Sequence, residues 1–269
     1  MNEEIRFQDV SFEFSPSSKV IHNISLTIER GTLVGIVGAN GSGKTTLARL
    51  LNGNLHPTSG KILVDGLSPY FEPLQVKRLV GIIQADAENQ IIAPTVYDEV
   101  SFGLHALGMK ESEVHKQVES ALDTFGLSQY RDTHPFYLSV GEQFRLLVAG
   151  AIVRRPSYLI LDEVLSMLDS PTRKNFVSLL VDLQNKLQVG IVLITHRIED
   201  LINTDKVIVL DSGRVAMEMK ISDILRHNQN IDDWNIELPL GFKVSTLLGG
   251  PNKKLIRNYL YTLDENKGI

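Results

Sequence analysis

The sequence predicts an α/β fold built on a mostly parallel sheet. Continuous apolar runs in LVGIV (33–37), SYLILDE (157–163) and VGIVLITH (189–196) are typical of strands that are buried on both faces. Between them lie segments such as NFVSLLVDLQNKL (175–187), whose apolar residues recur at the spacing of an amphipathic helix. Alternation of such strands and helices predicts helices packed against a parallel sheet.

Shorter strands are expected in the N-terminal region. IRFQDVSFEF (5–14) and ISLTI (24–28) alternate apolar and polar residues, as strands with one buried face do. KILVDG (61–66) and LVGII (79–83) are further strand candidates. We therefore expect an N-terminal antiparallel β subdomain beside the parallel core.

A helical insert is expected at about 85–155, inside the α/β core. Within it, ESEVHKQVESALDTFGL (111–127) has helical apolar spacing, and Gly126 ends the helix. Towards the C-terminus the sequence turns polar, with scattered apolar anchors. We expect a main domain over residues 1–225 and a small C-terminal extension over 226–269.

Composition excludes several classes of protein. The chain has 269 residues and no cysteine, so disulfide frameworks and cysteine zinc sites are excluded, and a reducing compartment fits. Its net charge of −5 lacks the basic excess that nucleic-acid-binding proteins usually show. The acidic N-terminus is unlike a signal peptide, and no run approaches the roughly 18 apolar residues of a membrane span. We expect a chain that does not cross a membrane but can dock on a protein that does.

The strongest motif is GANGSGKTT (38–46), which follows a predicted strand and opens a predicted helix. It fits the phosphate-loop pattern G-x-x-x-x-G-K-[ST] in full. Glycines let backbone N–H groups turn towards phosphate oxygens, Lys44 carries a charge for the β- and γ-phosphates, and Thr45 offers a hydroxyl to Mg²⁺. The alternative, a glycine-rich turn with a stray lysine, does not explain the flanking strand and helix. The expected nucleotide contacts are Gly38, Asn40, Gly41, Ser42, Gly43, Lys44, Thr45 and Thr46.

Phosphoryl transfer also needs a carboxylate for magnesium, a base for water and a group that senses the γ-phosphate. Asp162 ends a predicted buried strand and is the expected Mg²⁺ carboxylate, acting through water. Glu163 follows it and is the expected general base. His196 ends another predicted strand and can donate to the γ-phosphate. The alternatives are that Asp162 and Glu163 only cap a strand and that His196 is structural.

The stretch LSVGEQFRLL (138–147) reads as the start of a helix. Ser139 and Glu142 make the S-x-x-E pattern of a capping box, with Val140 as the first helical residue. The free N–H groups of such a helix start form an anion site.

Taken in order, these motifs resemble those of the ATP-binding cassette (ABC) ATPases over roughly residues 5–225. The resemblance implies a RecA-like P-loop core that binds ATP and Mg²⁺ and hydrolyses ATP. It implies that Phe14 stacks on adenine, unless it packs in the core instead, and that Gln84 senses Mg²⁺ and the attacking water. It also implies that Asp169 communicates across a dimer. LSVGEQ occupies the place of the family signature, so Ser139, Gly141 and Glu142 are expected to bind the ATP of a partner cassette.

A narrower resemblance comes from QADAENQIIAPTVYDEVSFGL (84–104), which is similar to the ATPases of energy-coupling-factor (ECF) transporters, including the cobalt-type cassettes. The resemblance implies a peripheral protein on the cytoplasmic face of the cell membrane that powers uptake of a vitamin or a metal ion. Its implied partners are a second ABC ATPase, a transmembrane coupling protein and a membrane substrate-binding protein, and no nucleic acid. The resemblance also implies that the C-terminal extension, 226–269, helps to hold the pair of ATPases together. The sequence does not name the solute, since a separate protein selects it in such systems.

The chain departs from the family pattern at the signature. Val140 replaces its first glycine. This departure affects the signature and not the pair Asp162 and Glu163, and it favours a non-identical partner over a homodimer. Val164 and Leu165 also replace usual residues but leave Asp162, Glu163, Ser166 and Asp169 in position. Two other functions stay open: a soluble ABC ATPase that acts on nucleic acid or ribosomes, and a regulatory cassette with weak hydrolysis.

Overall fold

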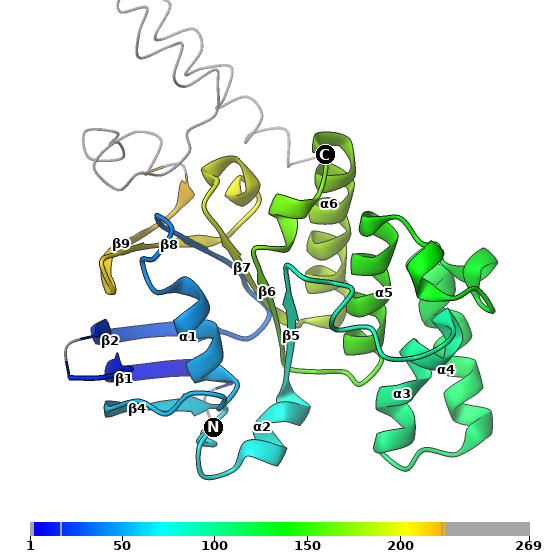
Figure 1. Cartoon of the computed structure of the whole chain (residues 1–269), viewed down its shortest axis with the longest axis horizontal. Coiled ribbons are helices and arrows are strands. Elements are labelled where there is room, and N and C mark those ends of the chain that lie inside the picture. Colours follow the sequence, from blue (N-terminus) through cyan, green and yellow to red (C-terminus); the bar gives the residue numbers. More distant parts are fainter. Residues whose placement is uncertain (1–2, 17, 222, 224–269) are drawn as a thin grey trace, which may run out of the picture.

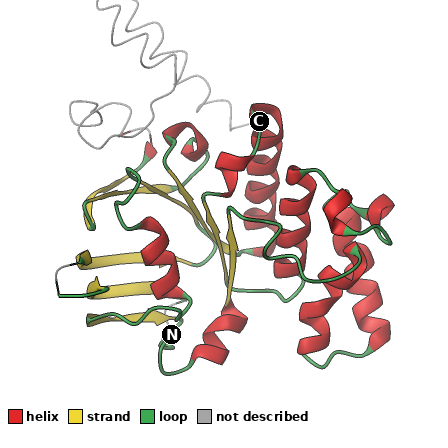
Figure 2. Ribbon diagram, viewed as in Figure 1, coloured by secondary structure: helices red, strands yellow, loops and turns green. Residues whose placement is uncertain are grey.

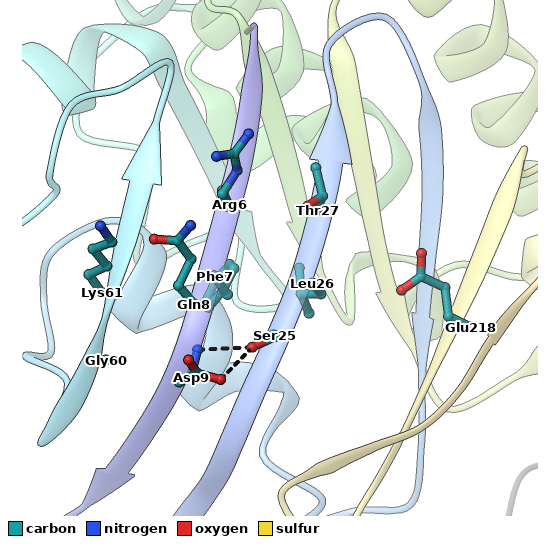
Figure 3. A pocket seen from close by; sticks show the side chains of 10 residues that line it. All are labelled: Arg6, Phe7, Gln8, Asp9, Ser25, Leu26, Thr27, Gly60, Lys61 and Glu218. Atoms are coloured by element: carbon teal, nitrogen blue, oxygen red, sulfur yellow. Dashed lines mark hydrogen bonds between the residues drawn. The ribbon is translucent and has the colours of Figure 1, made fainter.

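Two β-sheets and a group of helices form the part of the chain that the computed structural model describes, residues 3–16, 18–221 and 223 (Figures 1 and 2). One sheet has three antiparallel strands in the order β2-β1-β4, and the other has six in the order β5-β6-β7-β3-β8-β9. Neighbours in the larger sheet are parallel except for β8 and β9, which confirms the predicted fold class. The strands are β1 (Glu4–Glu13), β2 (Lys19–Glu29), β3 (Leu33–Val37), β4 (Ser59–Val64), β5 (Val80–Gln84), β6 (Tyr158–Asp162), β7 (Gly190–Thr195), β8 (Lys206–Asp211) and β9 (Arg214–Met219).

Helices and the smaller sheet cover the two faces of the parallel sheet. One face, through Ile160 and Val192, packs with α1 and the antiparallel sheet, and the other, through Leu159 and Leu193, packs with α5 and α6. This two-sided burial explains why β6 and β7 are continuous apolar runs. The α-helices are α1 (Lys44–Leu51), α2 (Pro73–Leu79), α3 (Val96–Ala106), α4 (Glu111–Thr124), α5 (Val140–Ile152) and α6 (Ser170–Leu187), and the 3-10 helices are η1 (Ser128–Tyr130), η2 (Pro135–Tyr137), η3 (Val164–Met167) and η4 (Ile198–Leu201).

The carboxyl ends of the parallel strands bring the predicted site residues to one edge of the sheet. Gln84 at the end of β5 pairs in register with Asp162 at the end of β6. At the end of β3, Val37 pairs with Thr195 of β7, one residue before His196. In open α/β sheets, ligands bind in the crevice outside these ends.

The helices α3, α4 and α5 lie between β5 and β6 in the sequence and stand on the side of the molecule away from the antiparallel sheet (Figure 1). In α4, Val114, Val118 and Leu122 are buried at a spacing of four residues, as the predicted amphipathic pattern requires. Gly126 follows with φ of 65°, a left-handed conformation that glycine adopts without strain and that ends the helix.

Helix α2 has no counterpart among the predicted elements. It begins at Pro73, a residue favoured in the first turn, and of its seven residues only Val76 is buried. One buried residue sets up no periodicity, so the sequence gives no helical signal here.

The expected C-terminal extension, 226–269, lies outside the described residues, and both its boundary and its role stay predictions. Among the residues that the structure describes, no helix combines the length and the apolar character needed to cross a membrane.

Candidate functional site

The loop from Gly38 to Thr46 joins β3 to α1, and its glycines are required by its backbone. Gly41 and Gly43 have φ of 83° and 103°, conformations that side chains disfavour. A Cβ on Gly38 would lie 2.2 Å from the carbonyl oxygen of Leu210. Because Gly43 is the N-cap of α1 and provides no side-chain cap, the first N–H groups of the helix are available to an anion.

Lys44 lies at the centre of this loop, and its side chain is only 5% exposed. Its ammonium donates hydrogen bonds to the carbonyl oxygens of Gly38 at 2.8 Å and Ala39 at 3.0 Å. The same Nζ is 3.5 Å from Oε1 of Glu163. The loop therefore holds a buried cation that forms an ion pair with the Glu163 carboxylate at its mouth and also lies close enough to Asp162 to favour its ionised form.

Asp162 ends β6 next to the loop and accepts a hydrogen bond from the Thr45 hydroxyl at 3.3 Å. Burial raises the pKa of the Asp162 carboxyl, and the hydrogen bond from Thr45 acts in the opposite direction with a smaller effect. A desolvated carboxylate beside a hydroxyl is an oxygen-donor pair that a cation would stabilise.

Glu163 has a left-handed backbone, with φ of 57°, which is uncommon outside glycine. Its N–H donates to the carbonyl oxygen of Ile194 on the neighbouring strand at 2.9 Å, which fixes this conformation. The turn directs the Glu163 carboxylate towards the phosphate loop, where its second oxygen meets His196. Strained residues of this kind cluster at functional sites.

His196 follows β7, and its Nδ1 lies 3.0 Å from Oε2 of Glu163. An ionised carboxylate only accepts hydrogen bonds, so the Nδ1 of His196 is the donor in this pair. Nε2 is then the ring nitrogen that remains for a ligand. The contact places His196 beside Glu163, and its role towards a phosphate stays a prediction.

A cavity of about 540 Å³ is bordered by the phosphate loop, Glu163 and His196. That volume falls in the range of small-molecule sites, roughly 300–1,000 Å³. Its described lining does not include four other predicted site residues, Gly38, Ser42, Gln84 and Asp162. Two of its lining residues, Val20 of β2 and Ser166, were not among the predicted site residues. Ser166 donates a hydrogen bond to the Glu163 carbonyl oxygen at 2.5 Å. The lining residues are Val20, Asn40, Gly41, Gly43, Lys44, Thr45, Thr46, Glu163, Ser166 and His196.

Phe14 follows β1 and is 60% exposed, which excludes the alternative that it packs in the core. Its ring contacts Phe12 edge to face, with centroids 4.8 Å apart. It does not belong to the described lining of the 540 Å³ cavity. An exposed aromatic ring held by a buried one is available to stack on a planar ligand.

The backbone of Gln84 is held by the side chain of Gln90, six residues later. The Gln90 side chain accepts a hydrogen bond from the Gln84 N–H and donates one to the Gln84 carbonyl oxygen, both at 2.9 Å. This leaves the Gln84 side chain without a partner in the described structure, next to Asp162 in the sheet register. Gln90 was not predicted as a site residue, and its signal is its position in the QADAENQ segment.

The signature segment has the predicted cap. Ser139 is the N-cap of α5, and it exchanges hydrogen bonds with Glu142 in a capping box, including one from the Ser139 hydroxyl to Oε2 at 2.6 Å. Burial raises the pKa of Glu142, but the hydrogen bonds from Ser139 and its other neighbours outweigh burial and lower it. Val140 is 47% exposed. Gly141 is buried, and a Cβ there would lie 2.6 Å from the Thr172 methyl group of α6.

The structure gathers only some of the predicted residues into one place. In the described lining of the 540 Å³ cavity, Ser139, Gly141 and Glu142 are absent. Asp169 is likewise outside it, as the exposed N-cap of α6 without a side-chain cap hydrogen bond. The phosphate loop and the signature are therefore separate surfaces of one chain.

Comparisons with known proteins give one consistent family. A family model described as ABC transporter matches residues 21–166. The chain is 32% identical to the energy-coupling factor transporter ATP-binding protein EcfA1 of Latilactobacillus sakei, over 97% of this chain and 94% of the relative. It is 33% identical to the cobalt import ATP-binding protein CbiO of Syntrophus aciditrophicus, over 91% of this chain and 86% of the relative.

Solved structures agree with these relatives. The structure of cbiO1 from Clostridium perfringens, described as part of the ABC transporter complex cbiONQ, matches with a TM-score of 0.80 and 30% identity, covering 87% of this chain and 95% of that chain. An ATP-bound bacterial Atm1-family ABC exporter matches with a TM-score of 0.74 and 26% identity, covering 87% of this chain and 42% of that chain.

Proposed function

The chain belongs to the ABC transporter family as an ATPase of the energy-coupling-factor and cobalt type, and from this premise we propose that it powers the uptake of a vitamin or a metal ion. The observation that carries the proposal is the Glu163 carboxylate between Lys44 and His196 at the mouth of the phosphate loop. A water molecule beside that carboxylate would lie where a γ-phosphate bound to Lys44 can be attacked.

Each residue of the site then has a role in hydrolysis. The loop N–H groups and Lys44 bind the β- and γ-phosphates, and Glu163 takes the proton of the attacking water. His196 orients Glu163 through Nδ1 and, as an imidazolium with a proton on both ring nitrogens, donates from Nε2 to the γ-phosphate. Phe14 stacks on adenine. The ion pair between Lys44 and Glu163 supports a nucleotide-free state in which the Glu163 carboxylate partly neutralises Lys44, as a bound phosphate would.

The oxygens of Thr45, Asp162 and Gln84 fit a magnesium ion, because they are hard ligands and two of them already lie 3.3 Å apart. When bound with ATP, the ion would neutralise charge on the phosphates. The raised pKa of Asp162 supports this assignment, since a cation would stabilise its buried carboxylate.

A partner cassette completes the site in this proposal. Ser139, Gly141 and Glu142 bind the γ-phosphate of a second cassette's ATP, and Asp169 contacts that cassette. The position of the signature outside the chain's own cavity supports such a head-to-tail pair. The exposed Val140 side chain supports a non-identical partner, because it narrows the space in front of the signature N–H groups.

A second cavity, of about 460 Å³, supports docking of a transmembrane coupling protein. It lies along α3, downstream of Gln84, and exposes Ile92 and Phe102 by 65% and 58%. Asp98 and His105 add polar groups to its wall. A cytoplasmic helix of the partner bound here would connect movement of the Gln84 segment to the membrane. The chain would then act at the cytoplasmic face of the membrane as a peripheral subunit.

Purification of the full, tagged chain from detergent-solubilised membranes of its own cells tests the proposal. We expect a second ABC ATPase, a multispanning membrane protein and a small membrane protein that binds the solute to co-purify, with ATPase activity in the complex. Recovery of the chain with ribosomes or nucleic acid instead would overturn it. Transport assays of the complex with candidate vitamins and metal ions then identify the solute.

A further inference from the structure

Four cations gather at the amino-terminal end of the parallel sheet, opposite the nucleotide edge. Lys77 and Arg78 lie in the last turn of α2, directly before β5, and Arg154 and Arg155 lie between α5 and β6. Because β5 and β6 are parallel neighbours that begin in register, both pairs lie at the same end of the sheet. Figure 1 shows α2 at the start of β5, at the end away from the phosphate loop.

These cations lack partners within the described part of the chain, where none of the four forms an ion pair. Lys77, Arg78 and Arg155 are exposed. Arg154 is partly buried: its guanidinium lies 3.9 Å from the position of a Cβ on Gly81. Burial lowers the pKa of Arg154, and no acidic side chain opposes that effect. A desolvated, unpaired guanidinium gains free energy when an external anion reaches it.

Two large apolar side chains stand beside the cations. Phe71 is 79% exposed and Leu74 is 77% exposed. Leu74 precedes Lys77 and Arg78 by three and four residues in α2, so the three share one face of the helix. Phe71 lies in the turn just before α2, and its ring contacts that of Tyr70, with centroids 4.8 Å apart.

The nearby acidic groups are already engaged. Glu72 accepts a hydrogen bond from the Ser68 N–H at 2.8 Å, and Asp65 accepts one from the Tyr158 hydroxyl at 2.6 Å. Glu3, which is also close to Tyr158, is paired with Arg30 at 3.1 Å. The four cations against Glu72 and Asp65 therefore leave a local positive excess on a chain whose net charge is −5. The excess is thus a local feature that would orient the chain against a negative surface.

We propose that Phe71, Leu74, Lys77, Arg78, Arg154 and Arg155, here the α2 surface, bind the anionic headgroups of a phospholipid membrane. The combination is the one that interfacial binding uses: apolar side chains enter the headgroup boundary while Lys and Arg pair with phosphates. This contact goes beyond the proposed function, because it needs neither ATP nor a coupling protein. It would give the ATPase a direct contact with the lipid bilayer in addition to its proposed contact with the coupling protein.

Vesicle flotation of the full purified chain, without nucleotide or partners, tests this binding. We expect the chain to float with vesicles that contain phosphatidylglycerol and not with pure phosphatidylcholine vesicles, and the bound fraction to fall as salt rises. Near an anionic surface each cation contributes about 1 kcal/mol, or about fivefold in binding, so Lys77→Glu/Arg78→Glu should weaken the partition by roughly 25-fold or more. Phe71→Ser/Leu74→Ser should also weaken it.

Matched controls distinguish binding through the α2 surface from binding caused by the overall charge of the chain or by any exposed aromatic side chain. Lys110→Glu/Lys116→Glu reverses two exposed cations on the helical insert, and Tyr137→Ser removes an aromatic side chain that is 84% exposed elsewhere. Both should float like the unchanged chain. Thermal unfolding with ATP checks that every variant is folded. Absence of flotation on anionic vesicles, equal flotation of the α2 variants, or binding without phosphatidylglycerol would each overturn the proposal, while the ATPase proposal would stand.

Discussion

Glu163 and His196 come from neighbouring strands and meet at the mouth of the phosphate loop, with Oε2 of Glu163 3.0 Å from Nδ1 of His196. The other oxygen of the carboxylate is 3.5 Å from Nζ of Lys44. In this arrangement the Glu163 carboxylate links the Lys44 ammonium of the phosphate loop to the His196 ring. The pair is pre-formed by the backbone, because the N–H of Glu163 is held by the strand that leads to His196.

Glu163→Gln tests the role of this carboxylate as the base. We expect ATP hydrolysis to fall by about 10²–10⁴-fold, because the amide cannot take a proton from water. ATP binding should persist or tighten, since the negative charge beside Lys44 is gone, and the closed pair of cassettes should accumulate. Phosphate release, equilibrium binding of a fluorescent ATP analogue and size-exclusion chromatography measure the three effects. Glu113→Gln, an exposed residue of α4, is the control, and normal turnover by Glu163→Gln would exclude the proposed role.

Asp162→Asn should stabilise the nucleotide-free chain at neutral pH. Burial raises the pKa of Asp162, so the folded chain resists its ionisation more than the unfolded chain does. The ionised group therefore lowers the free energy of unfolding above the raised pKa, and this penalty disappears as the pH falls below the ordinary Asp pKa of about 3.9. We expect a higher Tm for Asp162→Asn at pH 7 and a shrinking difference in acid.

Thermal unfolding across pH, compared with the exposed Asp182→Asn, measures this effect. With magnesium and ATP the unchanged chain should have the higher Tm, because it keeps the Asp162 carboxylate that binds the ion. A Tm for Asp162→Asn that is lower at neutral pH without ligand would contradict the burial argument.

Tyr158→Phe should weaken the fold without touching the site. The Tyr158 hydroxyl is buried and donates to Oδ1 of Asp65 at 2.6 Å, which ties the parallel sheet to the turn after β4. Loss of a hydrogen bond to a charged group costs about 1.5–3 kcal/mol. Urea unfolding should report that loss, and ATP turnover should be unchanged. The control is Tyr137→Phe, which alters an 84% exposed ring.

The parallel core was predictable because each central strand is a continuous apolar run, and the phosphate loop because its residues are consecutive. Helix α2 was not, since only Val76 of its seven residues is buried. Val20 of β2 lines the cavity because the antiparallel sheet packs next to the phosphate loop, and no local sequence pattern predicts that packing. The left-handed Glu163 was also unpredictable, because glutamate does not prefer that conformation and a neighbouring strand imposes it.

Gly141→Ala should destabilise the chain through packing, which the signature pattern does not reveal. The added methyl group would lie 2.6 Å from the Thr172 methyl group, so α5 and α6 would have to separate. Overpacking of this kind costs about 1–3 kcal/mol. Thr172→Ser removes the opposing methyl group and should restore most of the stability of Gly141→Ala in urea unfolding. Failure of that rescue would show that Gly141 is required for a reason other than contact with α6.

Val140→Gly tests whether the departure from the signature weakens the partner's site. Val140 is the first residue of α5 and is 47% exposed, so its removal leaves the Ser139 and Glu142 cap in place. Glycine in a helix costs about 1 kcal/mol at most, so the chain should stay folded. In the purified complex we expect turnover to stay equal or rise, because a branched side chain no longer stands where phosphate would approach the helix N–H groups. A large loss of turnover with unchanged stability would mean that the valine contributes to the pairing of the cassettes, and the steric explanation would be wrong.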